Sequence, residues 1–212
     1  MSFILKIKLK DTINKIQREV KIPKNITAKQ LTKVLIYSMG WSGEYSYEIF
    51  LPENNMIITN DIISLKAEKN EKDYKIKQTD KIRTIKISGH IEEAVKLDNE
   101  PTFIGETDFN LSNLLEKEEK IEFIYDFADR WIHYISVEKN DENIEVPEII
   151  SFCGNCPPED CGGAESYNNF YEFLKLSKKE KEKIDWGYGV YEKDFSQINA
   201  INSIMPFFQK VL

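Results

Sequence analysis

The sequence lacks the features that identify membrane proteins and the common enzyme classes. No apolar run approaches the roughly 18 residues that a membrane span requires. The 212 residues also contain no phosphate-binding P-loop, Gly-x-Gly-x-x-Gly turn, serine nucleophile elbow or His-Glu-x-x-His helix. We therefore expect no membrane contact, and no motif here names a reaction.

Positive charge and cysteine are both scarce. Lys and Arg number 29 against 36 Asp and Glu, which gives a net charge of −7. Binding to nucleic acid depends on neutralising phosphates, so the net charge does not support a nucleic-acid partner and a protein partner is favoured. The three cysteines favour free thiols or metal ligands over a disulfide framework. The first residues do not resemble a signal peptide, so we expect a cytoplasmic protein.

Hydropathy patterns predict strands and one helix in the first 60 residues. Alternation predicts four strands, over 3–10, 16–22, 45–51 and 56–59. Between the second and third, Thr27 and Gln30 form a capping-box pattern before a helix that ends at Gly40. This order predicts an N-terminal β-β-α-β-β unit of β-grasp-like type within an α+β fold.

The remainder of the chain adds a hairpin and C-terminal helices. Alternation predicts a strand over 83–88 and a hairpin over 121–138. Helical spacing predicts a helix over 167–174 and another over 195–204. Between them, Ser177 and Glu180 form a second capping-box pattern. We see no internal repeat and no linker, so we expect residues 1–212 to form a single α+β domain with a mostly antiparallel sheet.

The most unusual stretch is the loop 156–163, which reads Cys-Pro-Pro-Glu-Asp-Cys-Gly-Gly. Prolines fix φ and remove backbone donors, whereas glycines allow positive φ. The composition therefore predicts a loop of defined shape that carries thiols and carboxylates. We expect the loop 153–163 to pack against the hairpin 121–138.

The cysteines permit three interpretations. The spacing of Cys153, Cys156 and Cys161 is compatible with a zinc site, for which His133 is the natural fourth ligand. Alternatively, the thiols pack as small hydrophobic groups inside a proline-stiffened loop. The Cys-x-x-Cys spacing also has the form of a redox pair, although it lacks a thioredoxin-like context. The sequence alone leaves all three open.

Carboxylates and one histidine suggest a second kind of site. Asp126, Asp129, His133 and Glu159 could together bind a divalent ion or carry out acid–base chemistry. The alternative is that His133 is a hydrogen-bonded core residue, because it shares a strand face with Trp131, while the loop carboxylates bond to nearby backbone. Aromatic residues could also line a groove; the candidates are Trp41, Tyr45, Tyr47, Trp131 and Trp186.

The hairpin and the loop together resemble the plasmid pRiA4b ORF-3-like family. Residues 125–133 read Tyr-Asp-Phe-Ala-Asp-Arg-Trp-Ile-His, close to the family's Tyr-Asp-Phe-Gly-Asp-x-Trp-x-His, and the loop 156–163 matches at every position. The likeness spans nearly the whole chain. Two departures stand out: Ala128 replaces the hairpin glycine, and residues 44–47 replace histidines that the family usually carries.

The resemblance implies an α+β fold and an association with plasmids and insertion elements, but no established activity. Our leading hypothesis is a binding or accessory module that uses the hairpin 121–138 and the loop 153–163. The alternative is a metal-dependent hydrolase or nuclease that uses Asp126, Asp129, His133 and Glu159.

Overall fold

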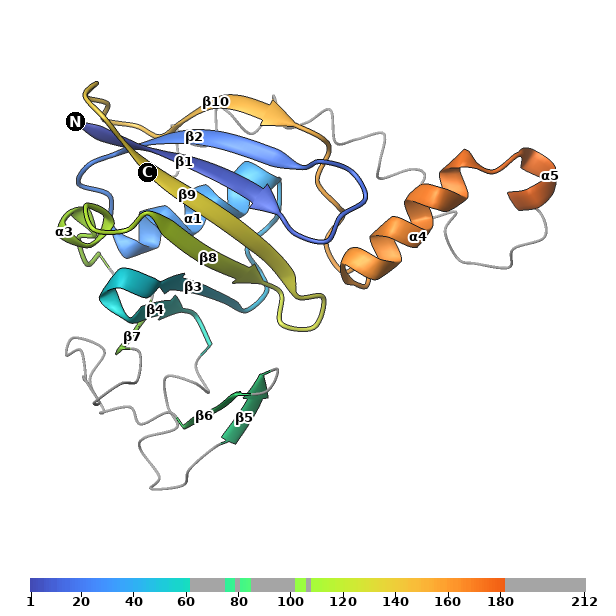
Figure 1. Cartoon of the computed structure of the whole chain (residues 1–212), viewed down its shortest axis with the longest axis horizontal. Coiled ribbons are helices and arrows are strands. Elements are labelled where there is room, and N and C mark those ends of the chain that lie inside the picture. The colour runs from blue at the N-terminus through green and yellow to red at the C-terminus, as the bar shows by residue number, and fades with distance from the viewer. Residues whose placement is uncertain (62–74, 79–80, 85–101, 106–107, 182–212) are drawn as a thin grey trace.

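An eight-stranded sheet forms the body of the protein (Figure 1). The computed structural model describes residues 1–61, 75–78, 81–84, 102–105 and 108–181. The sheet has the order β10-β2-β1-β9-β8-β3-β4-β7, and every neighbouring pair is antiparallel except β4 and β7. Its strands are β1 (Ser2–Leu9), β2 (Gln17–Pro23), β3 (Tyr47–Leu51), β4 (Met56–Thr59), β7 (Thr102–Ile104), β8 (Lys120–Tyr125), β9 (Trp131–Asn140) and β10 (Glu148–Cys153). These observations confirm the predicted α+β class and the mostly antiparallel sheet.

The elements of the first 60 residues lie where the sequence predicted them. Helix α1 (Ala28–Met39) begins after Thr27, whose hydroxyl accepts from the Gln30 backbone N–H while the Gln30 side chain accepts from the Thr27 N–H. The helix ends at Gly40, whose N–H bonds to carbonyls of the last turn. A short 3-10 turn, η1 (Pro52–Asn54), joins β3 to β4.

The structure does not confirm a β-grasp-like unit. Strands β1 and β3 are not neighbours, because the hairpin of β8 and β9 lies between them. The first 60 residues therefore contribute strands to both sides of a hairpin that comes much later in the chain.

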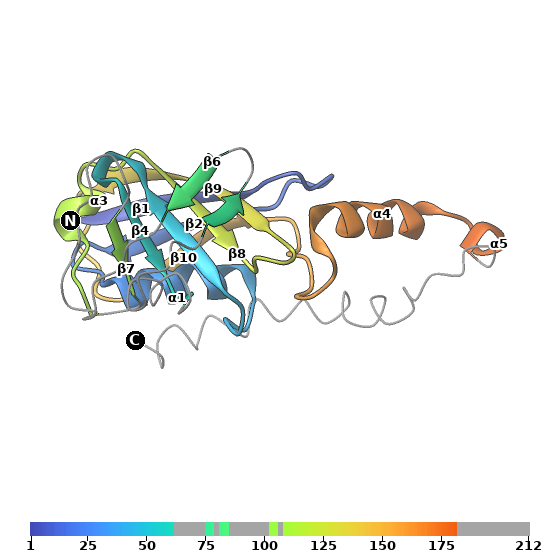
Figure 2. The same ribbon diagram turned by 90° about the horizontal axis from the view of Figure 1, so that it is seen from below.

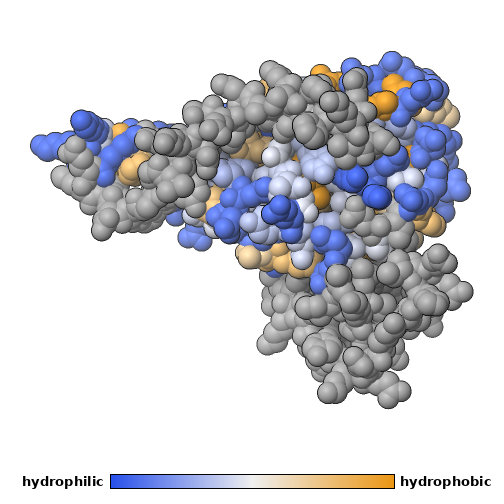
Figure 3. Space-filling model, turned by 180° about the vertical axis from the view of Figure 1, so that it is seen from behind, coloured by the Kyte–Doolittle hydropathy of each residue, from blue (hydrophilic) through white to orange (hydrophobic). Residues whose placement is uncertain are grey.

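The core lies between α1 and one face of the sheet. Leu31, Val34 and Leu35 of the helix are fully buried, as are Leu5 and Ile7 of β1. Lys6 and Lys8 alternate with them and are exposed on the other face. On the side opposite to the view of Figure 1, apolar side chains of described residues show only in small separate areas (Figure 3).

The helices after the sheet leave the body at the end where the β8–β9 hairpin turns. Helix α4 (Gly163–Lys175) projects beyond the strands in both ribbon views and leads to α5 (Lys178–Lys181) (Figures 1 and 2). A further short helix, α3 (Ser112–Leu115), precedes β8. None of the described helices is long and apolar enough to cross a membrane.

Two predicted elements lie wholly or partly outside the described residues. The predicted strand over 83–88 overlaps β6 (Lys81–Thr84), which pairs with β5 (Lys75–Gln78) in a separate two-stranded sheet. The predicted helix over 195–204 and the candidate groove residue Trp186 lie outside the described part of the chain.

Candidate functional site

Three segments that are distant in sequence meet where β8 turns into β9. They are the connection 41–46 after α1, the hairpin turn 126–130 and the loop 156–163. We call the surface that they form the hairpin–loop face. Its contacts confirm the prediction that the hairpin 121–138 packs against the loop 153–163: the Gly162 N–H donates to Asp129 Oδ2 at 3.0 Å, and Tyr125 donates to Glu159 at 2.5 Å.

Trp41 lies at the centre of this junction. The residue is 4% exposed, and its ring stacks on Tyr125, with centroids 4.9 Å apart and planes 11° apart. It also contacts Trp131 at 6.0 Å and meets His133 edge to face at 5.3 Å. Its indole N–H donates to the carbonyl of Pro157 at 2.9 Å. One side chain thus joins the helix end, the hairpin and the cysteine loop.

Glu159 holds the loop to the connection after α1. Its carboxylate accepts from the Ser42 N–H at 3.0 and 2.9 Å and from the Ser42 hydroxyl at 3.1 Å, in addition to Tyr125. The Tyr125 hydroxyl accepts in turn from the Gly43 N–H at 3.1 Å. Burial, followed by the bond to Glu159, raises the pKa of Tyr125 well above its usual value, so the phenol stays a proton donor.

The two hairpin aspartates shape the turn. Asp126 is 4% exposed, and its carboxylate accepts from the backbone N–H groups of Ala128 and Asp129 at 3.0 and 3.3 Å. The missing turn glycine is accommodated without strain at Ala128, because positive φ falls on Asp126 (57°) and Arg130 (53°) instead. An aspartate tolerates this region better than most side chains do.

The glycines of the loop permit a close backbone approach to the hairpin. Gly163 has φ of 75°, and a Cβ there would lie 2.5 Å from the carbonyl oxygen of Asp129. No side chain other than hydrogen fits that distance. Gly162 and Gly163 at the end of the loop therefore determine how closely the loop and the hairpin turn can pack.

A buried arginine anchors the start of the loop. Arg18 of β2 is 0% exposed and donates to the carbonyls of Ser38, Cys153 and Gly154 at 2.9, 3.1 and 3.0 Å. Its Nη2 donates to Cys156 Sγ at 2.8 Å, and that thiol donates to Met39 Sδ at 3.3 Å. As a thiol, Cys156 thus has one donor and one acceptor as partners. Burial raises its pKa to about 12, which keeps it protonated despite the nearby guanidinium.

The predicted zinc ligands occupy different environments. Cys153 is exposed at the end of β10, whereas Cys156 and Cys161 are buried free thiols. Burial raises the pKa of Cys161 to about 12, with a smaller contribution from Asp129. Among the described residues, no group of three or more His, Cys, Asp or Glu side chains could hold a metal ion. The zinc site of Cys153, Cys156, Cys161 and His133 stays a prediction.

His133 is a core residue, as the strand parity indicated. It is 0% exposed, and its Nδ1 lies 3.1 Å from the carbonyl oxygen of Phe123. Because that oxygen can only accept, Nδ1 carries the proton. Burial lowers the pKa of His133 to about 4, so the ring is neutral at physiological pH. Trp131, two residues before it, is equally buried at 1%.

Negative charge gathers on the outside of the hairpin–loop face. Burial raises the pKa of half-buried Tyr45, and the nearby carboxylates of Asp160, Glu159, Asp126 and Glu44 raise it further. None of these carboxylates forms an ion pair with a lysine or arginine of the described residues. The three segments of the face thus carry five carboxylates and one positive group, Arg130.

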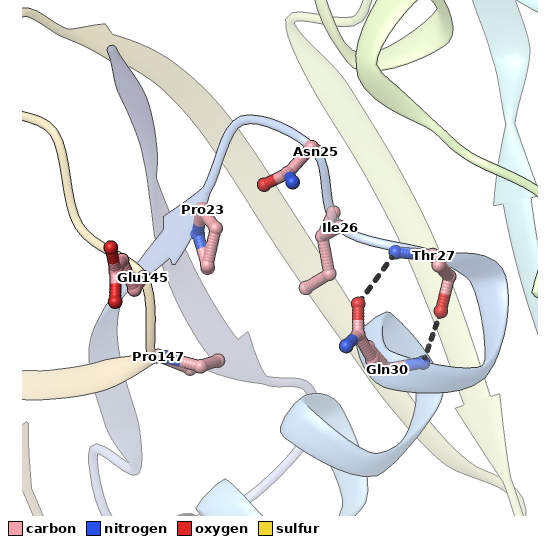
Figure 4. A pocket seen from close by; sticks show the side chains of 7 residues that line it. All are labelled: Pro23, Asn25, Ile26, Thr27, Gln30, Glu145 and Pro147. Atoms are coloured by element: carbon pink, nitrogen blue, oxygen red, sulfur yellow. Dashed lines mark hydrogen bonds between the residues drawn. The ribbon is translucent and has the colours of Figure 1, made fainter. Parts of the chain in front are cut away.

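A pocket of about 260 Å³ lies elsewhere, at the other end of α1 (Figure 4). Its lining residues are Pro23, Asn25, Ile26, Thr27, Gln30, Glu145 and Pro147. None of the residues that the sequence singled out for metal binding or catalysis lines it.

The four residues predicted to act as an acid–base site lie in one region, but their side chains bond to different partners. Asp126 bonds within the turn, Asp129 bonds to the loop and Glu159 bonds to Ser42, while His133 lies in the core. Arg18 and Ser42 were not predicted from the sequence. Arg18 could have been found, because it shares the inward face of β2 with Val20 and Ile22; Ser42 carries no such signal.

Comparison with known proteins places the chain among relatives without a known activity. A family model described as plasmid pRiA4b ORF-3-like protein matches residues 1–200. An uncharacterized protein of Sinorhizobium fredii, y4hQ, is 23% identical over 205 residues, which cover 91% of this chain and 88% of that protein. A crystal structure of a protein of unknown function from Methanosarcina mazei Go1, MM3350, is similar with a TM-score of 0.55 and 23% identity, over 85% of each chain. At this identity, the structural likeness shows a shared fold.

Proposed function

The chain belongs to the plasmid pRiA4b ORF-3-like family, and we propose that it is a non-catalytic binding or accessory module that docks a protein partner on the hairpin–loop face. The proposal includes a single domain, a cytoplasmic location and an association with mobile elements. The partner presents a basic surface to the carboxylates around Tyr45.

The observation that carries this proposal is how the reactive groups are used. Glu159 and Asp129 accept backbone N–H groups from other segments, and Asp126 closes its own turn. Cys156 is buried against Arg18, and His133 is buried in the core. Side chains that could catalyse a reaction are thus engaged in fixing the shape of the face. A surface held rigid before binding loses little conformational entropy when a partner docks.

The charge of the face supports the choice of partner. Glu44 and Asp160 are exposed, and Tyr45 is half-buried between charged neighbours. A patch of one sign attracts a surface of the opposite sign and speeds its association, an effect that salt weakens. Arginine is the best matched contact, because a guanidinium both pairs with carboxylates and stacks on an aromatic ring.

A titration followed by NMR tests the proposal with a defined probe. Deca-arginine should shift the backbone amides of Gly43, Tyr45 and Gly162, and the effect should fall as salt rises. Deca-glutamate should leave these amides unchanged. Shifts spread over the acidic surface, or confined to other elements, would contradict the proposal.

Matched variants separate a specific face from general acidity. The double variant Glu44→Gln, Asp160→Asn removes two charges from the hairpin–loop face, and asparagine tolerates the φ of 58° at position 160. The control double variant Asp141→Asn, Glu145→Gln removes two exposed charges from the connection before β10. The first variant should weaken binding of deca-arginine at least several-fold, while the second leaves it nearly unchanged.

The metal-dependent hydrolase or nuclease alternative makes a different prediction. If Asp126, Asp129, His133 and Glu159 hold a divalent ion, Mn²⁺ should broaden the Ser42 and Gly162 amide signals selectively at equimolar concentration. Such broadening would favour the alternative over the binding module. Uniform weak broadening across exposed carboxylates would leave the binding module favoured.

A further inference from the structure

Two buried polar atoms on the inner face of β9 have no partner among the described protein groups. They are the indole N–H of Trp131, a hydrogen-bond donor, and Nε2 of His133. Nearly all buried polar side-chain atoms in folded proteins have a protein or water partner. A buried polar atom without a partner destabilises the folded state, so two together on one strand require an explanation.

The two atoms have complementary roles. His133 Nδ1 donates to the Phe123 carbonyl, so Nε2 carries a lone pair and can only accept in the neutral ring. Trp131 Nε1 can only donate. A bridging group must therefore offer a lone pair to the indole and a hydrogen to the imidazole.

The rings that carry these two atoms pack against the same side chain, Trp41. Positions 131 and 133 lie on one side of the strand, so their Cβ atoms are separated by about 6.6 Å. Both rings contact Trp41, at centroid distances of 6.0 and 5.3 Å. Two side chains of this length that pack against a common ring can bring their polar atoms within hydrogen-bonding reach of one small molecule.

The chemistry of the pair limits what that molecule can be. A cation would suit the lone pair of His133 but would face the positive hydrogen of the indole. An anion would suit the indole but would face the imidazole lone pair. Both side chains are at most 1% exposed, so an uncompensated charge would also be costly to bury. The pair fits a small neutral hydroxyl group, and water is the smallest.

We propose that one internal water molecule bridges the indole N–H of Trp131 and Nε2 of His133 and forms a permanent part of the core beneath Trp41. Buried waters of this kind bond to polar groups that would otherwise be unsatisfied. The water fixes the orientation of both rings against Trp41, which in turn carries the loop through Pro157. The inference does not depend on the proposed function.

The chain contains its own control. Trp41 is similarly buried, at 4%, but its indole N–H donates to the carbonyl of Pro157. A ROESY spectrum should therefore show a cross-peak between water and the indole proton of Trp131, with the sign of a dipolar contact rather than of exchange. The indole proton of Trp41 should show none. Spectra of Trp131→Phe and Trp41→Phe assign the two signals.

Removal of the acceptor sharpens the test. In His133→Phe, the Trp131 cross-peak should be lost while the Trp41 indole signal keeps its position. If that variant does not fold, a crystal structure of the unaltered protein at about 1.5 Å decides, since it should show one water within hydrogen-bonding distance of both atoms. Absence of a Trp131 cross-peak in the unaltered protein, equal cross-peaks at both tryptophans, or a crystal structure with the two atoms unbridged would each overturn the proposal.

Discussion

The two ends of helix α1 differ in how their side chains are bonded. The N-terminal end is closed by Thr27 and Gln30, which lie three positions apart and satisfy each other's backbone N–H groups (Figure 4). The C-terminal end passes at once into Trp41 and Ser42, whose partners Pro157 and Glu159 lie 116 and 117 positions away. The side-chain cap at the N-terminal end is local, although the Ala28 N–H there also donates to the distant Phe109 carbonyl at 2.9 Å. At the C-terminal end, the Trp41 indole and the Ser42 N–H both donate to distant segments.

This difference explains where the uncommon residues of the chain are concentrated. A local cap needs only a hydroxyl and an amide at the right spacing. A junction of three segments needs large buried rings, charged groups that accept backbone donors and glycines that allow close approach. The hairpin–loop face has all of these, so damage there should cost more stability than damage at the N-terminal end of α1.

The largest effect is expected from Trp41→Ala. Loss of a fully buried indole should lower the free energy of unfolding by about 3–5 kcal/mol. Trp41→Phe should cost less, because the ring contacts remain and only the bond to Pro157 is lost. Chemical denaturation of the three proteins measures both values. A midpoint for Trp41→Ala within error of the unaltered protein would contradict the three-segment junction.

Low pH should lower the free energy of unfolding through His133, which packs against Trp41 at the C-terminal end of α1. Its pKa is lowered from 6.5 to about 4 in the folded protein, so the unfolded chain binds more protons between these values. Stability should therefore be complete above about pH 6.5 and fall as the pH drops towards 4, by roughly 3 kcal/mol in total.

Because other groups titrate in the same pH range, the contribution of His133 is isolated by comparing the unaltered protein with the variant His133→Gln. The stability difference between the two proteins should change across pH 4 to 6.5 and be constant outside it. A difference that does not vary with pH would show that His133 titrates normally in the folded protein.

Gly163→Ala tests the close approach between the loop and the hairpin. The new Cβ would meet the Asp129 carbonyl oxygen at 2.5 Å, in addition to the strain of a positive φ. We expect a loss of roughly 2–3 kcal/mol. Gly43→Ala is the matched control, because its φ is also positive, at 85°, but its nearest neighbour is an Ile36 side-chain atom at 3.7 Å. Equal losses at the two glycines would mean that only φ matters.

The smallest effect is expected at the N-terminal end of α1. Thr27→Ala removes the acceptor for the Gln30 N–H and should cost about 1 kcal/mol. Thr27→Ser keeps a hydroxyl and should cost little. A loss for Thr27→Ala as large as that for Trp41→Ala would reverse the ranking of the two helix ends.

The local features of the fold could be predicted from the sequence, because their determinants are close together. The capping box at Thr27, the helix end at Gly40 and the inward parity of His133 all follow from spacings of a few residues. The β-grasp-like unit was not confirmed, because the pairing of β1 with β9 joins residues more than 120 positions apart. Hydropathy alternation identifies strands but not their neighbours.

The candidate site was predicted in part for the same reason. Residue composition pointed to the hairpin and the loop, and the structure brings them together. The partners of Glu159 and Cys156, which are Ser42 and Arg18, could not be paired with them by spacing. The sequence does not distinguish a carboxylate that accepts a backbone N–H from one that binds a metal ion.

Amide hydrogen exchange at Ser42 and Gly162 tests most directly whether carboxylates hold the hairpin–loop face together. Both N–H groups are on exposed residues but donate to Glu159 and Asp129. Bonds to charged acceptors are worth about 1.5–3 kcal/mol, so both amides should exchange roughly 10- to 100-fold more slowly than the exposed Glu145 amide, after correction for intrinsic rates. Glu159→Ala should release Ser42, and Asp129→Ala should release Gly162. Exchange of both amides at the rate of Glu145 in the unaltered protein would contradict the account.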